Sequence, residues 1–188
     1  MLGASICFTC SARFHAISNH SQTIAASARQ VDCCGIVALM WGASLPAIHF
    51  GFVDDPASRN LHWLLVSICS VACLTLTLHH FFMDRAGRTY RVIAFVGLGA
   101  FWIVFLLHGC LLCEGADQRR RFGLEWLALV ASLNMTGAAC YALRFPERWF
   151  PYRFDLVGSS HQIFHVAVLI AGIVHYKALA EAFRAVRG

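Results

Sequence analysis

Charged residues are scarce in this sequence: only 13% of its 188 residues are Asp, Glu, Lys or Arg, whereas 59% are hydrophobic. A soluble domain usually carries about 25% charged and about 45–50% apolar residues. The shortage of charge excludes a disordered chain and an ordinary cytosolic enzyme. The net charge of +5 comes from scattered arginines and not from a basic block, so no nucleic acid is expected as a partner. What remains is a helical integral membrane protein.

The sequence also lacks a disulfide framework, an internal repeat and a low-complexity tract. Its nine cysteines are an odd number, and most of them lie within apolar runs. A free cysteine in such a run behaves as a small hydrophobic residue. We therefore expect one all-α domain over residues 1–188, with free thiols.

Five apolar segments are long enough to cross a bilayer, which takes about 20 residues because the hydrocarbon core is about 30 Å thick. The predicted spans of this polytopic bundle are residues 33–53, 61–83, 92–113, 122–143 and 158–183. A shorter apolar run, Met1–Cys10, ends at Arg13 and His15 after about half the length of a span. We therefore expect the chain to begin partway down a membrane helix that covers residues 1–16.

Alternation of the spans brings four ionisable residues to one face of the membrane. His15 ends the partial helix, Asp32 precedes the next span, and His161 and His165 lie near the start of the last span. Ionisable groups at membrane depth are costly and usually face the interior of the bundle. Each of the four is therefore a candidate functional residue.

The spacing of His161 and His165 is typical of metal ligands, because residues four apart on a helix share one face. Two such imidazoles can bind one Zn²⁺, and His15 would be the third ligand. Three protein ligands leave a position open for water, as in catalytic zinc sites. Asp32 could orient that water or accept its proton, and Ser11 lies one helical turn before His15.

Six further histidines are scattered through the spans, and for most of them the expected role is that of a hydrogen-bonded interior residue. They are His49, His62, His79, His80, His108 and His175. His62 and His108 leave a second interpretation open, a pair of haem ligands in a b-type cytochrome, which needs two histidines at matching depth on facing helices.

Several motifs carry a family resemblance. Tyr141-Ala-Leu-Arg-Phe-Pro-Glu-Arg-Trp-Phe-Pro151 is followed by Phe154-Asp155 and by Ser160-His161-Gln162-Ile163-Phe164-His165. This pattern closely resembles the last-helix region of the progestin and adipoQ receptor family, which includes the adiponectin receptors and the haemolysin III proteins. Val31-Asp32-Cys33-Cys34-Gly35-Ile36 looks like the third helix of that family, and Ser11-Ala-Arg-Phe14-His15 like the end of its second helix. The resemblance covers essentially the whole chain.

The resemblance implies a seven-helix membrane fold, of which the first helix and part of the second are missing here. It implies a zinc ion near the cytosolic face, with His15, His161 and His165 as ligands, Asp32 beside the water and Ser11 at the family's serine position. Because the wider superfamily includes alkaline ceramidases, it also suggests hydrolysis of a lipid amide such as ceramide.

Two functional interpretations follow. In the first, the protein is a zinc-dependent lipid hydrolase linked to signalling or to lipid and metal homeostasis, with Asp32 and Ser11 as catalytic residues. In the second, it is a non-catalytic signalling receptor in which the zinc is structural. The expected partners are the bilayer of the plasma membrane or an endomembrane, a ceramide-like lipid substrate or ligand, and, for a receptor, a protein ligand.

Overall fold

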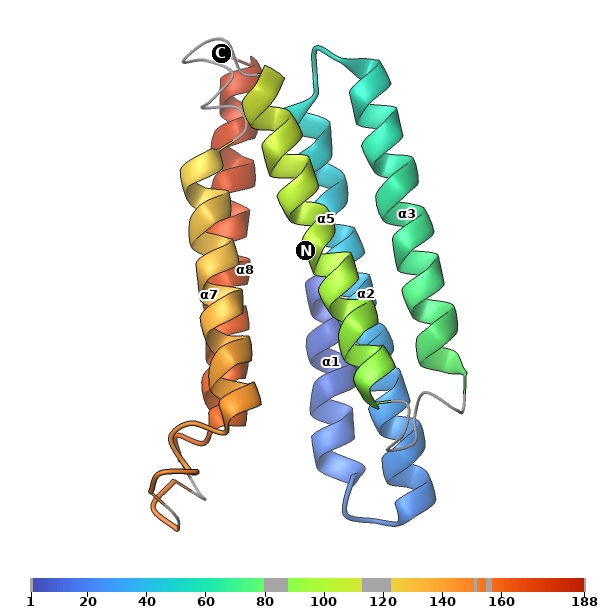
Figure 1. Ribbon diagram of the computed structural model, residues 1–188, viewed down its shortest axis with the longest axis vertical. Coiled ribbons are helices and arrows are strands. Elements are labelled where there is room, and N and C mark those ends of the chain that lie inside the picture. The colour runs from blue at the N-terminus through green and yellow to red at the C-terminus, as the bar shows by residue number, and fades with distance from the viewer. Residues whose placement is uncertain (1, 80–87, 113–122, 151, 155–156, 188) are drawn as a thin grey trace. The chain divides into compact units, whose positions relative to one another are not determined.

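The computed structural model describes residues 2–79, 88–112, 123–150, 152–154 and 157–187, and all regular secondary structure in them is helical. This confirms the predicted all-α class. The helices are drawn in Figure 1 and are, in chain order, α1 (Leu2–Ile17), α2 (Gln22–Gly51), α3 (Pro56–Leu78), α5 (Arg88–Leu112), α7 (Leu124–Leu143) and α8 (Ser160–Arg187).

The chain divides into two compact units. The N-terminal unit, Met1–Gln118, contains α1, α2, α3 and α5, and the C-terminal unit, Arg119–Gly188, contains α7 and α8. Each unit is described by itself below.

Four helices in the described residues are long and apolar enough to cross a membrane: α2, α3, α7 and α8. Within α5, a shorter apolar helical stretch covers Ile93–Gly109. These helices overlap the five predicted spans, of which residues 80–83, 113 and 122 lie outside the described part of the chain, and they confirm a multi-pass membrane protein. Helix α2 begins at Gln22, well before the predicted span, because the Ser21 hydroxyl caps it by accepting the Ile24 N–H at 3.2 Å. Hydropathy finds the part of a helix that lies in hydrocarbon, and it does not find such a polar extension.

Small residues let α1 and α2 pack closely and antiparallel. A Cβ atom added to Gly3 of α1 would lie 2.5 Å from the carbonyl oxygen of Ala38. A Cβ atom added to Gly35 of α2 would lie 3.0 Å from the Cα of Cys7. Close backbone approach of this kind is how membrane helices gain van der Waals contact without a hydrophobic driving force.

Polar side chains join α2 to α3 near both ends of the pair. The indole N–H of Trp63 donates to the Leu45 carbonyl at 3.0 Å, and the Gln30 amide donates to the Leu78 carbonyl at 2.7 Å. Hydrogen bonds of this kind between membrane helices satisfy groups that hydrocarbon could not. They fix the position of α3 along α2.

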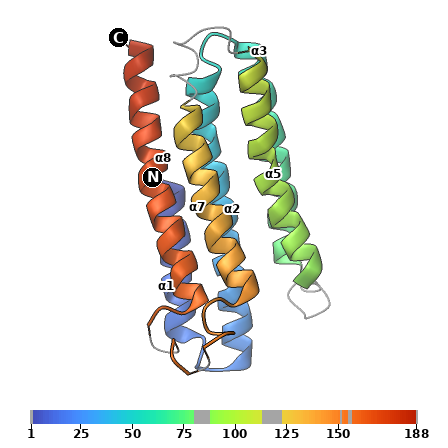
Figure 2. The same cartoon turned by 60° about the vertical axis from the view of Figure 1, so that its left-hand side comes forward.

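Helix α3 starts with a strong cap. Asp55 accepts the N–H groups of Ala57 and Ser58, both at 3.1 Å, and Pro56 occupies the first helical position. Hydrogen bonds from the side chain and backbone of Ser58 hold the pKa of the Asp55 carboxyl below its usual value. As Figure 2 shows, α5 lies beside α3.

In the C-terminal unit, α7 and α8 form an antiparallel pair. They approach closely at Gly137, where an added Cβ atom would lie 2.9 Å from the Cβ of Ala167. Helix α7 ends because Arg144 adopts the left-handed conformation (φ 54°) and Phe145 then donates its N–H back to the Cys140 carbonyl at 3.0 Å. Pro146 follows and cannot continue a helix.

Candidate metal centre

The start of α8 is held by a carboxylate from the segment that follows α7. The Ser160 N–H donates to Glu147 Oε2 at 2.8 Å, and the Ser160 hydroxyl donates to Glu147 Oε1. These hydrogen bonds, that of the hydroxyl above all, lower the pKa of the Glu147 carboxyl. A negative charge at a helix N-terminus also interacts favourably with the helix dipole. Ser160, the first residue of α8 and the direct neighbour of His161, is thereby held in place.

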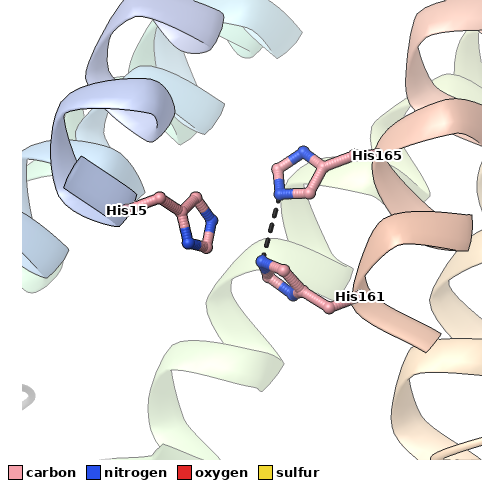
Figure 3. A group of neighbouring side chains, drawn as sticks. All are labelled: His15, His161 and His165. Atoms are coloured by element: carbon pink, nitrogen blue, oxygen red, sulfur yellow. Dashed lines mark hydrogen bonds between the residues drawn. The ribbon is translucent and has the colours of Figure 1, made fainter. Parts of the chain in front are cut away.

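His161 and His165 lie on one face of α8, as their spacing predicted. Their Nε2 atoms are 3.1 Å apart, and their rings are almost perpendicular, with an interplanar angle of 86° (Figure 3). Two imidazole nitrogens bound tetrahedrally to one Zn²⁺ at 2.0–2.1 Å would be about 3.3 Å apart. The observed separation is close to that value, so little movement would be needed for both rings to ligate one ion.

Helix α7 supports this face of α8 through an aromatic contact. The ring of Tyr141 lies 5.4 Å from the ring of His161 and 5.8 Å from that of Phe164, centroid to centroid. Both histidines are half-buried. The pair is therefore packed against α7 on one side and is only partly covered.

The other predicted site residues belong to the N-terminal unit. His15, also drawn in Figure 3, is exposed in the last turn of α1, and Ser11 is buried one turn earlier on the same helix. Asp32 is half-buried on α2. The structure thus brings His161 and His165 together in one unit and puts Ser11, His15 and Asp32 on two adjacent helices of the other.

The antiparallel register of α1 and α2 brings Ser11 level with Asp32. The glycine contacts described above set this register nearer the start of α1. Further along, the guanidinium of Arg29 lies 5.8 Å from the centre of the Phe14 ring. Ser11 and Asp32 fall between these two sets of contacts, so they occupy the same level of the helix pair.

Sequence reasoning missed two features. It assigned no role to Glu147, whose partner Ser160 lies beyond an irregular segment. It also left open how His62 and His108 lie, and the structure shows that His62 Nε2 and His108 Nδ1 are 3.4 Å apart. Their rings stack with the centres 5.0 Å apart, whereas two haem ligands coordinate end-on from opposite faces of the porphyrin, so this arrangement does not support the haem interpretation. Sequence position could have indicated this pair, because His62 lies near the start of α3 and His108 near the end of α5.

The cysteines that the structure describes are all free, as expected. They are Cys7, Cys10, Cys33, Cys34, Cys69, Cys73 and Cys140.

Comparison with known proteins gives consistent matches over most of the chain. The model of a family described as "Haemolysin-III related" matches residues 1–176. The adiponectin receptor protein of Drosophila melanogaster is 35% identical over 180 residues, which are 96% of this chain and 40% of the receptor. The ADIPOR-like receptor IZH1 of Eremothecium gossypii is 32% identical over 184 residues, 97% of this chain and 58% of the relative. Heptahelical transmembrane protein 5 of Arabidopsis thaliana is 32% identical over 177 residues, which are 94% of this chain and 47% of the relative. The chain spans about half the length of these relatives.

Proposed function

Because the chain belongs to the haemolysin-III-related family of membrane proteins, we propose that it holds a zinc ion with His15, His161 and His165 and hydrolyses a lipid amide of the ceramide type. The observation that carries the proposal is the 3.1 Å separation of the His161 and His165 Nε2 atoms on one helix face. Each of the three histidines offers a ring nitrogen, and neutral imidazole is a preferred zinc ligand.

Membrane topology supports His15 as the third ligand. If successive helices cross the membrane in alternating directions, the end of α1 and the start of α8 would face the same side. His15 is in the last turn of α1, and His161 is in the first turn of α8. The motif resemblance assigns the same three residues.

Asp32 and Ser11 carry the proton chemistry in this proposal. Zinc, when bound, acts as a Lewis acid that polarises a carbonyl and makes water more acidic. The carboxylate of Asp32 accepts a proton from water as the water oxygen bonds to the amide carbon. It then returns a proton to the nitrogen as the carbon–nitrogen bond breaks, which leaves a fatty acid and an amine. Ser11, level with Asp32, serves to orient this carboxylate.

The apolar surroundings suit a lipid substrate. Only 13% of the residues are charged, and the helices expose large apolar side chains to the bilayer, among them Leu64, Ile103 and Leu169. The acyl chains of a lipid amide can therefore stay in hydrocarbon while its polar end meets the histidines. A soluble amide would gain nothing from such a site.

A second candidate function is a signalling receptor in which the zinc is structural. It is favoured by the names of two relatives, an adiponectin receptor protein and an ADIPOR-like receptor. In that case the three histidines would join helices, and Asp32 would carry no chemistry.

The test uses the full chain in lipid nanodiscs, with zinc content and fatty acid release from ceramide as separate readouts. We expect about one zinc per chain and slow hydrolysis, both lost in His161→Ala. The matched control is His175→Ala, because His175 lies further along the same helix. Asp32→Asn separates the two candidates: it should keep zinc and abolish hydrolysis if the protein is an enzyme. Zinc without any turnover in the unaltered chain would favour the receptor, and absence of zinc would refute both.

A further inference from the structure

A second histidine pair lies inside the N-terminal unit and has no part in the proposed zinc site. The Nδ1 atom of His62 is 2.8 Å from the Ser58 carbonyl oxygen, and its Nε2 atom is 3.4 Å from His108 Nδ1. A carbonyl oxygen only accepts, so Nδ1 of a neutral His62 must carry the hydrogen and Nε2 the lone pair. His108 must then donate from Nδ1, which leaves its own Nε2 as the available proton acceptor. The neighbouring groups thus define the tautomers of both rings.

Aromatic rings enclose this pair. Phe52, which caps the end of α2, stacks on His62 with the ring centres 4.8 Å apart. Phe101 and Phe105 of α5 make T-shaped contacts with His62, with the ring centres 6.0 and 5.9 Å apart. His62 is 2% exposed, and Phe105 is 1% exposed. The pair therefore joins α3 to α5, against the end of α2. Its buried member, His62, lies where a charge is solvated poorly, whereas His108 is half-buried.

Few charged groups face the pair. The Asp55 carboxylate at the start of α3 is close enough to interact electrostatically with both imidazoles, and Asp54 precedes it in the same turn. The guanidinium of Arg59 on α3 lies over the ring of Trp63, and His49 of α2 stacks on the same ring. Between residues 92 and 109, α5 carries no ionisable side chain except His108. In the part of the chain that the structure describes, the Asp55 carboxylate interacts with both imidazoles and can balance one positive charge on the pair.

We propose that His62 and His108 form a proton-binding site that couples acidification to separation of α3 from α5. The first proton binds His108 Nε2, keeps the hydrogen bond to His62 and is balanced by Asp55. A second proton can bind only at His62 Nε2, the atom that accepts the hydrogen bond, so that bond breaks. Two imidazolium rings with their centres 5.0 Å apart, packed among phenylalanine rings, then repel each other and drive the helix ends apart. This site does not depend on the proposed zinc centre.

Hydrogen–deuterium exchange on the full chain in nanodiscs tests the proposal, with labelling times corrected for the intrinsic effect of pH. Amide protection in residues 52–62 and 101–109 should fall about tenfold or more between about pH 8 and about pH 5. His108→Asn should abolish this response, because the Asn amide can replace the Nδ1 donor but cannot bind a proton. The control His49→Asn changes a histidine near the same turn outside the pair and should respond like the unaltered chain.

Two results would overturn the proposal. One is equal protection of these segments at both pH values in the unaltered chain, and the other is a full pH response in His108→Asn. If His108→Asn does not fold, ¹⁵N spectra of histidine-labelled unaltered chain decide the matter. Both rings should titrate in two coupled steps, and a pair that keeps its neutral spectrum across the same pH range contradicts the proton site.

Discussion

His161 and His165 of α8 differ from His62 and His108 in how their rings are held. In the α8 pair, both residues are half-buried on one helix, and the rings meet almost at right angles. In the other pair, the rings belong to two helices and stack with an interplanar angle of 24°. His62 is also bonded to a carbonyl through its second nitrogen, whereas the α8 pair meets through the two Nε2 atoms.

The difference separates two uses of the same side chain. A metal needs lone pairs that converge on an accessible point, and the nearly perpendicular, half-buried rings of α8 suit that need. A proton site needs one nitrogen fixed as donor and another fixed as acceptor, and the anchored, enclosed rings of α3 and α5 suit that need. Ring-nitrogen distances alone, 3.1 and 3.4 Å, would not distinguish the pairs. The burial of His62 and the angle between the two rings of each pair do.

The largest expected effect concerns zinc as a stabilising ligand. A ligand present at a thousand times its dissociation constant stabilises the folded state by about 4 kcal/mol. Removing zinc with a chelator should therefore lower the melting temperature of the unaltered chain by several degrees. His165→Ala should show a low melting temperature that the chelator does not change, whereas His108→Asn should keep the response to the chelator. A chelator effect in His165→Ala would mean that the metal binds elsewhere.

A smaller effect should come from truncating His62, the buried member of the other pair. His62→Ala removes the packing against Phe52 and leaves the Ser58 carbonyl without its side-chain donor. We expect a loss of about 2–4 kcal/mol in the free energy of unfolding, the range for opening a cavity in a packed core. In chelator-treated protein, His165→Ala should cost much less because His165 is half-buried. Denaturation monitored by tryptophan fluorescence gives the free energy of unfolding of both variants. Equal losses in the two variants would contradict the inference that His62 is the more tightly packed residue.

The sequence predicted one pair better than the other for a physical reason. His161 and His165 meet through helix periodicity alone, so their spacing sufficed. His62 and His108 meet only because the register of α3 against α5 brings them to one level, and the helix packing that sets this register involves side chains far apart in the sequence. The same holds for Glu147, which reaches Ser160 across an irregular segment. The spans followed from hydropathy, but the start of α2 depended on a local cap at Ser21.

The smallest expected effect concerns the carboxylates that begin the two histidine-bearing helices. Asp55 caps α3 locally, whereas Glu147 reaches α8 from a distant segment, and hydrogen bonds lower both pKa values. Each carboxylate therefore stabilises the fold fully above the pKa of its unfolded form, about 4 for either residue, and this contribution is lost as the pH falls through the lowered pKa of the folded form. Asp55→Asn and Glu147→Gln should lower the melting temperature near neutral pH, and the deficit should shrink in acid.

The two variants should differ in what else they change. Glu147→Gln loosens the turn that carries His161. We expect zinc affinity to fall by less than about tenfold, because Glu147 positions the residue next to a ligand and is not itself a ligand. Asp55 caps α3, which carries none of the proposed zinc ligands, so Asp55→Asn should leave zinc affinity unchanged while it alters the acid response of residues 52–62. Zinc competition against a chelator, measured near neutral pH, makes the comparison. An equal loss of zinc affinity in both variants would show that Glu147 acts only through the stability of the fold. A local role at the start of α8 predicts that only Glu147→Gln weakens zinc binding.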